Sequence, residues 1–210
     1  MTSIIKNSHA DLSLPHSTPG MRIGLFGGSF NPAHEGHRLV TRQALKRLGL
    51  DAIWWLVTPG NPLKDHSELK PLSERIAAAR SLMDHPRVRI TGFEAKHGFK
   101  YSYDTLAYLK QTLPGRKFVW IMGADNLVSF HKWDRWQDMA QLMPIAVYVR
   151  PGATHNAPFA PAAQAMARWR VDESDAACFA DMRAPAWIYL HGIMSDLSST
   201  QLRQGAKRRG

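Results

Sequence analysis

The sequence has 210 residues, of which 44% are hydrophobic and 21% charged, values that suit one folded domain and exclude disordered, collagen-like and disulfide-stapled chains. The net charge of +10 makes polyanions the favoured ligands, nucleotides as well as RNA. Basic residues do not alternate with aromatics along any one candidate strand, as single-strand binding would favour, so we expect solvated surface charge and no nucleic-acid partner.

The first 20 residues are polar, contain Pro15 and Pro19, and show no sustained hydrophobic period. We expect residues 1–20 to be a flexible N-terminal extension and residues 21–210 to form the single domain. No secretory signal and no apolar stretch long enough for a membrane span is present, which predicts a cytoplasmic protein without a membrane partner. Cys178, the only cysteine, can form no intramolecular disulfide and is expected to be a small buried hydrophobe.

After this extension, short apolar runs alternate with segments of helical period. Strands are expected over residues 22–26, 52–57, 88–91, 118–122, 145–149 and 187–190. A first helix should follow the first strand, with one apolar stripe and with Gly49 placed to end it. A second helix is expected from an N-cap at Ser73 to Met83, and a third from about Tyr103 to just before Pro114. This alternation predicts an α/β domain with a Rossmann-like, doubly wound parallel sheet, which binds ligands at the carboxyl ends of its strands.

The loop after the first strand, GLFGGSFNPAHEGHRLV over residues 24–40, lies at that ligand-binding edge. Gly27 and Gly28 allow backbone to approach a ligand closely, and His34 and His37 share one face at the start of a helix. The free N–H groups and partial positive charge of a helix N-terminus favour a phosphate, to which two imidazoles add directed donors.

Other interpretations of this loop stay open at this point. The glycines match neither the GxGxxG fingerprint of dinucleotide-binding folds nor the GxxxxGK(S/T) loop of P-loop enzymes. A zinc site is conceivable, but two histidines are too few ligands for it. An ordinary turn that carries surface histidines is the remaining alternative.

The segment GGSFNPAHEGH resembles the Gly-Gly-(Ser/Thr)-Phe-(Asp/Asn)-Pro-x-His-x-Gly-His signature of the nucleotidyltransferases related to class I aminoacyl-tRNA synthetases. Within that group it is most similar to the bacterial nicotinate mononucleotide adenylyltransferases. The resemblance implies that His34 and His37 bind ATP phosphates and stabilise the charge that develops during transfer. It also implies a nucleotide site lined by the backbone of four loop residues, Gly27, Gly28, Ser29 and Phe30.

Near the C-terminus, LSSTQLR over residues 197–203 resembles the second motif of this family. Hydroxyl residues at a helix start and an arginine one turn later can hold phosphate oxygens, although a routine helix cap beside a surface arginine would look the same. In this motif the resemblance assigns four residues to ATP binding: Ser198, Ser199, Thr200 and Arg203. It assigns a fifth, Arg150, in a separate Arg-Pro-Gly turn.

Further segments resemble the family's acceptor-binding positions. In MGADNLVSFHKW, residues 122–133, an aspartate precedes a tryptophan by eight residues, so Asp125 and Trp133 are expected at the acceptor. The indole could stack on a pyridine ring or belong to the core. YSYDTL, residues 101–106, has serine where the family usually has threonine, and implies that three residues lie near the acceptor: Ser102, Asp104 and Thr105.

Two basic residues, Lys64 and Arg75, match family positions near substrate phosphate and ATP. The implied reaction is attack of the 5′-phosphate of nicotinate mononucleotide on the α-phosphorus of ATP, with release of pyrophosphate and no covalent enzyme intermediate. Positioning and charge neutralisation are then the main tasks, for which Mg²⁺ is expected with ATP and no metal site made of protein side chains. The residues expected to be catalytic are His34, His37, Lys64 and Arg203.

Two classes of alternative function are compatible with these motifs. The acceptor could be nicotinamide mononucleotide or pantetheine phosphate instead, or the chain could be a non-catalytic module that binds nucleotide or RNA. The spacing of Asp125 and Trp133 and the SYDTL segment favour nicotinate. The partners expected are the small molecules ATP and nicotinate mononucleotide. The sequence does not predict an oligomeric state.

Overall fold

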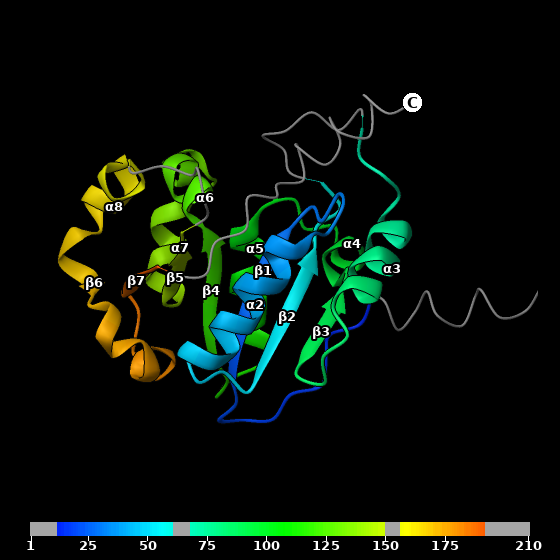
Figure 1. Cartoon of the computed structure of the whole chain (residues 1–210), viewed down its shortest axis with the longest axis horizontal. Coiled ribbons are helices and arrows are strands. Elements are labelled where there is room, and N and C mark those ends of the chain that lie inside the picture. Colours follow the sequence, from blue (N-terminus) through cyan, green and yellow to red (C-terminus); the bar gives the residue numbers. More distant parts are fainter. Residues whose placement is uncertain (1–11, 61–67, 150–155, 192–210) are drawn as a thin grey trace, which may run out of the picture.

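The computed structural model describes residues 12–60, 68–149 and 156–191 (Figure 1). Within these residues seven strands form one sheet in the order β3-β2-β1-β4-β5-β7-β6, and every neighbouring pair is parallel. The strands are β1 (Arg22–Gly28), β2 (Ala52–Val57), β3 (Val88–Thr91), β4 (Lys117–Gly123), β5 (Ile145–Tyr148), β6 (Arg170–Val171) and β7 (Trp187–Leu190). The chain proceeds outward from β1 to β3 and then returns to place β4 on the other side of β1. Ligands bind such sheets where the order reverses, which here is beside the carboxyl end of β1.

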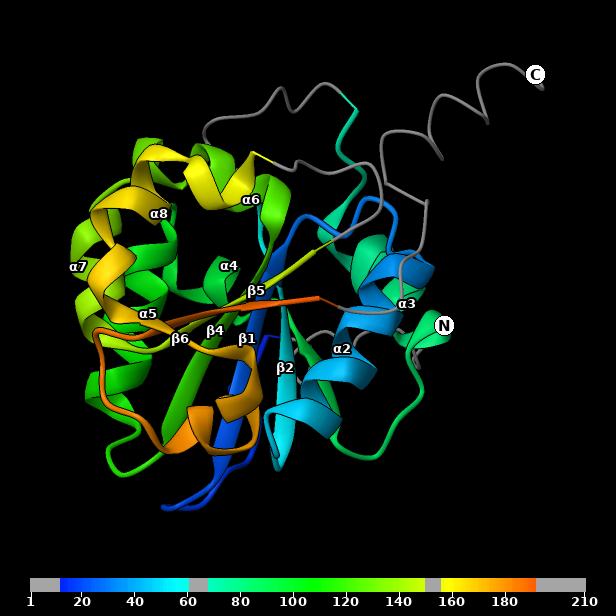
Figure 2. The ribbon, with the colours of Figure 1, turned by 60° about the vertical axis from the view of Figure 1, so that its left-hand side comes forward.

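Helices cover both faces of the sheet (Figure 2). One face carries α2 (Glu35–Arg47), α3 (Leu72–Leu82) and the 3₁₀ helix η4 (Glu173–Asp181). The other carries α4 (Phe93–His97), α5 (Ser102–Thr112), α6 (Ala124–Ser129), η1 (Phe130–Lys132), α7 (Trp136–Leu142), η2 (Ala157–Phe159), α8 (Pro161–Ala165) and η3 (Ala167–Trp169). The expected α/β fold with a doubly wound parallel sheet is confirmed.

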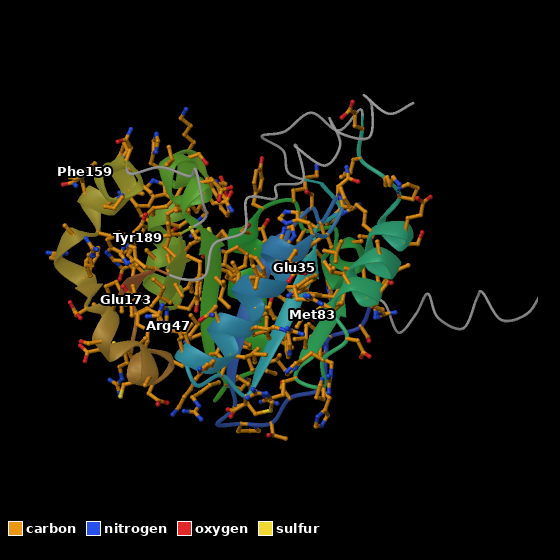
Figure 3. The ribbon with its side chains drawn as sticks, in the orientation of Figure 1. Glu35, Arg47, Met83, Phe159, Glu173 and Tyr189 are labelled. Carbon is orange, nitrogen blue, oxygen red and sulfur yellow. The ribbon has the colours of Figure 1, made fainter. Side chains whose placement is uncertain are left out.

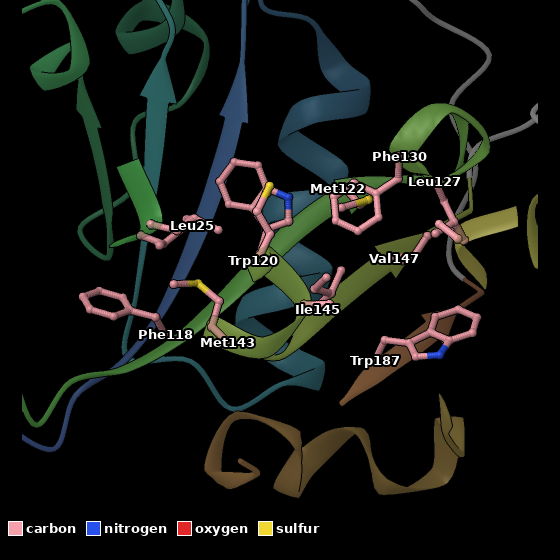
Figure 4. Close-up of a cluster of buried hydrophobic side chains, with 14 of the residues drawn as sticks. Leu25, Phe118, Trp120, Met122, Leu127, Phe130, Met143, Ile145, Val147 and Trp187 are labelled. Atoms are coloured by element: carbon pink, nitrogen blue, oxygen red, sulfur yellow. The ribbon is translucent and has the colours of Figure 1, made fainter. Parts of the chain in front are cut away.

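The strands are apolar along their length because both of their faces are buried. In β2, for example, Trp54 packs into the core on the face that carries α4, whereas its neighbour Trp55 packs into the core on the face that carries α2. Figure 4 shows the first of these two cores, where side chains of β1, β4, β5 and β7 meet the helices above them. On the opposite face, α2 is held at two points along its length. Trp55 Nε1 donates to Thr41 Oγ1 at 2.8 Å, and Arg47 pairs with Glu173 of η4 at 2.6 Å (Figure 3).

Most elements lie where the sequence predicts them, with ends that differ by one or two residues. Gly49 adopts a left-handed φ of +57° just after α2, as expected for a helix terminator. The N-cap predicted at Ser73 is wrong: α3 begins at Leu72 after Pro71, because the side chain of Leu72 packs against the core. The buried environment predicted for Cys178 is also wrong, since η4 turns Phe179 toward the sheet and leaves the thiol exposed.

Residues 12–20 of the expected N-terminal extension make contacts with the rest of the domain. Thr91 Oγ1 donates to Ser13 O at 2.8 Å, and Arg116 Nη2 donates to Ser17 O at 2.8 Å. Leu14 packs against the hydrophobic core. Residues 1–11 lie outside the described residues. No helix in the described segments combines the length and the apolar character that crossing a bilayer demands.

Candidate active site

A cavity of about 360 Å³ opens beside the carboxyl ends of β1 and β2. Its wall comes from segments far apart in the sequence: Gly27–Ser29, Thr58 and Gly60, Glu94, residues 99–102, Trp120, Asn126, residues 132–134 and Met139. The predicted site residues Gly27, Gly28, Ser29, Ser102 and Trp133 are among them. The structure therefore brings three of the sequence motifs to one cavity.

The glycine loop is shaped by its protein neighbours before any ligand binds. A Cβ atom at Gly27 would lie 2.5 Å from Cη2 of Trp120, so the indole needs a glycine opposite it. Phe30 has a positive φ of +46°, a conformation that L residues rarely adopt. Its ring stacks on Trp55 with centroids 4.7 Å apart. Because the side chain of Phe30 is buried in the core, only its backbone can face a nucleotide, as the family resemblance implies.

The two loop histidines form the cap of α2. The backbone N–H of Gly36 donates to His34 Nδ1 at 3.1 Å, and the backbone N–H of His34 donates to His37 Nδ1 at 3.1 Å. The ring centroids are 3.8 Å apart, and both side chains are buried. The prediction that the two imidazoles lie side by side at the helix start is confirmed.

This capping arrangement determines what the histidines can offer chemically. A ring nitrogen that accepts an N–H carries no proton, so in each neutral imidazole the proton is on Nε2. Both rings thereby hold an N–H donor at the N-terminus of α2, where the helix dipole favours negative charge. The arrangement suits phosphate oxygens and does not require either imidazole to act as a base.

Arg75 was expected near the substrate phosphate and ATP, but its guanidinium is buried among backbone carbonyls of the protein. Its side chain is 2% exposed, and it donates to the backbone carbonyls of Lys70, Ser29 and Thr58 at 2.7–2.8 Å and to that of Pro59 at 3.4 Å. Burial lowers the pKa of this guanidinium. Arg75 thus joins the glycine loop after β1 to the segment after β2, with its donors directed at protein carbonyls.

The SYDTL segment forms the start of α5. Ser102 lines the cavity, whereas Asp104 is half-buried in the first turn and is not part of the cavity wall. Thr105 is fully buried, and its Oγ1 donates to Glu94 Oε1 at 2.7 Å. Burial raises the pKa of Glu94 to about 7, an effect that the hydroxyls of Thr105 and Thr58 partly oppose.

An aromatic wall closes the cavity on the side of η1. Trp133 is half-buried, with its ring centroid 5.5 Å from that of Phe130 in an edge-to-face contact. The indole therefore both packs on the core and lines the cavity, so the two alternatives considered for it are compatible. Asp125 is exposed in the first turn of α6 and does not line the cavity; its neighbour Asn126 does.

Several expected site residues lie outside the described residues. These are Lys64, Arg150, Ser198, Ser199, Thr200 and Arg203. The strand that precedes the last four, β7, ends at Leu190 within the described sheet, beside β5.

Sequence reasoning did not assign the other residues of the cavity wall to the site, and three of them matter for its chemistry and shape: Thr58, Glu94 and Trp120. Thr58 follows β2 directly and Glu94 comes shortly after β3, and polar residues at the carboxyl ends of parallel strands are typical of ligand sites. Trp120 lies in the middle of β4, where nothing in the local pattern distinguishes it from a core residue. Its place in the cavity wall follows from the absence of a side chain at Gly27 on the neighbouring strand.

The described residues do not form a metal site. No group of three or more His, Cys, Asp or Glu side chains among them is arranged to hold an ion. The two imidazoles use their Nδ1 atoms for the helix cap, and Mg²⁺ prefers oxygen ligands.

Comparison with known proteins places this geometry in a family. Residues 25–205 match the family described as Cytidylyltransferase-like. A protein of Methylorubrum extorquens named "Probable nicotinate-nucleotide adenylyltransferase" is 58% identical over 183 residues, 87% of this chain and 99% of that protein. The chain belongs to the nicotinate-nucleotide adenylyltransferase family. Relatives of the same name from Mesorhizobium japonicum and Agrobacterium fabrum are 50% and 52% identical, cover 92% and 89% of this chain, and are matched over their full length.

Solved structures show the same fold at low sequence identity. Plasmodium falciparum nicotinic acid mononucleotide adenylyltransferase complexed with NaAD matches with a TM-score of 0.63 and 17% identity, over 87% of this chain and 82% of that chain. The same enzyme complexed with APC matches with a TM-score of 0.62, 16% identity and the same coverage. Membership in the adenylyltransferase family and the doubly wound sheet thus agree.

Proposed function

We propose that this chain transfers AMP from ATP to nicotinate mononucleotide, giving nicotinate adenine dinucleotide and pyrophosphate in the synthesis of NAD. The observation that carries the proposal is the cap of α2, in which the Nδ1 atoms of His34 and His37 accept backbone N–H groups and leave the proton of each neutral ring on Nε2. Neither histidine lines the cavity, but the glycine loop that precedes them does. The names of relatives at 50–58% identity support the same reaction. We place it in the cytoplasm, where ATP is available and a lone cysteine stays reduced.

In the proposed mechanism the enzyme positions two anions and neutralises the charge between them. The backbone of the glycine loop, with His34 and His37, binds the ATP phosphates, together with Arg150, Ser198, Ser199, Thr200 and Arg203. The acceptor occupies the cavity, with its pyridine ring on Trp133 and its phosphate toward Lys64. A phosphate nucleophile is already ionised at neutral pH, so no general base is needed, and the histidines act by stabilising the developing charge. Mg²⁺ bound together with ATP would supply further charge neutralisation, and we assign it no ligand among the protein side chains.

Residues 102, 104, 105 and 125 belong to the acceptor side in this proposal, in two different ways. Ser102 and the backbone around it face the cavity, whereas Thr105 acts through Glu94. The acidic side chains of Asp104 and Asp125 stand at the first turns of α5 and α6, outside the cavity wall. Arg75 supports the ends of β1 and β2 from the other face of the sheet.

The decisive experiment measures pyrophosphate release with ATP, Mg²⁺ and each of three acceptors: nicotinate mononucleotide, nicotinamide mononucleotide and pantetheine phosphate. We expect nicotinate mononucleotide to give the highest kcat/KM, and chelation of the divalent cation to stop the reaction. A preference for another acceptor would reassign the substrate within the same chemistry. Release with none of them would contradict the transferase and favour a module that only binds nucleotide.

A further inference from the structure

Glu94 is an acidic group in the wall of the acceptor cavity, and the proposed mechanism gives it no contact with the acceptor. It lies on α4 directly after β3, and its side chain is 7% exposed. Its Oε1 accepts a 2.7 Å hydrogen bond from Thr105 Oγ1 of α5, and the hydroxyl of Thr58 at the end of β2 interacts with the same carboxyl. The carboxyl is therefore built into the cavity wall by contacts from two other elements.

No ion pair within the described segments neutralises this carboxyl. The other ionisable side chains around it are Lys96 and His97 of α4, Lys100 and Tyr101 before α5, Asp104 of α5, Lys132 and Asp134 beside η1, and Arg75 of α3. All of those that line the cavity are exposed. The guanidinium of Arg75 is directed at backbone carbonyls, including that of Thr58. An ionised Glu94 would thus be a buried carboxylate stabilised by hydroxyls alone, which is unfavourable.

We propose that Glu94 is a specificity-determining residue of the acceptor cavity, whose neutral carboxyl admits the carboxylate of a nicotinate ring and whose ionised form repels it. This inference rests on the proposed function, which brings such an acceptor into the cavity. When the acceptor fills this cavity of about 360 Å³, its carboxylate and that of the buried Glu94 cannot both stay ionised at low cost. Binding of nicotinate mononucleotide is therefore coupled to protonation of Glu94.

The carboxyl is suited to respond near neutral pH, because burial raises the pKa of Glu94 to about 7. Below this pH the free enzyme already carries the proton. Above it the proton must be taken up on binding, so affinity for nicotinate mononucleotide falls by up to about tenfold per pH unit. Nicotinamide mononucleotide carries a neutral carboxamide, whose NH₂ group can donate to an ionised carboxyl. Its affinity does not have this pH dependence.

The test is the ratio of kcat/KM for nicotinate over nicotinamide mononucleotide, measured from pH 6.5 to 8.5. Both acceptors have the same titrating phosphate, so the ratio isolates the base ring. For the native enzyme we expect the ratio to fall by up to about 25-fold across this range, and for Glu94→Gln to stay flat. Thr105→Val removes a hydroxyl that favours the ionised form and should move the fall to higher pH. The matched control Glu74→Gln, at an exposed position on α3, should follow the native profile.

A second measurement does not depend on turnover. Calorimetric titration with nicotinate mononucleotide at pH 8, in two buffers that differ in ionisation enthalpy, counts the protons taken up. We expect a value close to one for the native enzyme and close to zero for Glu94→Gln. A native ratio that stays flat while both acceptors are turned over would refute the role of Glu94 and leave the proposed function intact. Failure of both acceptors to be turned over would instead contradict the function on which the inference rests.

Discussion

Substitution of His37 can separate two tasks that one imidazole performs. Its Nδ1 accepts the backbone N–H of His34 at 3.1 Å in the cap of α2, and its Nε2 is the proposed donor to an ATP phosphate. Asparagine can place an acceptor near the position of Nδ1 but does not reach that of Nε2. Glutamine reaches the Nε2 position and lacks the cap. Alanine loses both contacts.

The structure sets the size of each effect. Loss of the cap costs about 1 kcal/mol. His37 also packs at 4.8 Å from Phe30 and 5.8 Å from Phe26, so alanine leaves a gap and the total cost is about 2 to 3 kcal/mol. For a chain of this size that lowers the Tm by about 5 to 10 °C. Loss of one electrostatic donor in the transition state costs about 3 kcal/mol, or ~10²-fold in kcat.

The assay is pyrophosphate release at saturating ATP and nicotinate mononucleotide, with thermal unfolding measured in parallel. His37→Asn should keep its Tm within about 3 °C of the native value and lose ~10²-fold in kcat, with KM for the acceptor changed less than about threefold. His37→Ala should lose the same activity and also the stability. His16→Asn, at an exposed position, is the control for both measurements. Near-native kcat in His37→Asn would refute the role of this histidine as a charge-stabilising donor.

Four further predictions follow from contacts of the described residues. Arg75→Met should lower the free energy of unfolding by about 3 kcal/mol or more, because it leaves buried carbonyls without donors, and Arg75→Lys should lower it less. Equal urea midpoints for the native protein and Arg75→Met would contradict this structural role. Deletion of residues 1–11 should leave the Tm nearly unchanged, whereas deletion of residues 1–19 should lower it by several degrees, because residues 12–19 contact Thr91 and the core. An unchanged Tm in the longer deletion would support a flexible extension over all of residues 1–19. The native enzyme should prefer nicotinate over nicotinamide mononucleotide by about 10²- to 10⁴-fold in kcat/KM, because an amide NH₂ that faces backbone N–H donors leaves polar groups unpaired. Trp133→Ala should lower kcat/KM for both acceptors and change their ratio much less. A collapse of that ratio would show that the indole itself discriminates between the two acceptors. The pKa of Glu94 rises from 4.5 in the unfolded chain to about 7 in the folded one, so its contribution to the free energy of unfolding is fully present below pH 4.5 and is lost by about pH 7. Across this window the native protein should lose up to about 3 kcal/mol of stability relative to Glu94→Gln. Parallel pH profiles of stability for the two proteins would be inconsistent with a buried carboxyl.

Local patterns in the sequence predict the elements and the main chemical motif. Strands that are buried on both faces read as continuous apolar runs, and a helix that follows each run produces a parallel sheet wherever it occurs. The loop with His34 and His37 is equally local, because a helix cap and an i, i+3 pair involve only neighbouring residues. The prediction fails where a short polar pattern competes with packing, as at Ser73: the helix starts one residue earlier, at the partly buried Leu72.

The sequence by itself therefore determined the α/β class, the glycine–histidine loop and its position after the first strand. Only the tertiary structure decided that Gly27 faces Trp120, that Arg75 donates hydrogen bonds to three separate backbone segments, and that Thr105 donates a hydrogen bond to Glu94. These contacts join residues of different elements, and the strand order that places β1 between β2 and β4 brings Gly27 to Trp120 and the ends of β1 and β2 to Arg75. The physical reason is that hydrophobic period and helix capping act over a few residues, whereas burial of a charge and the shape of a cavity depend on every element that packs around them.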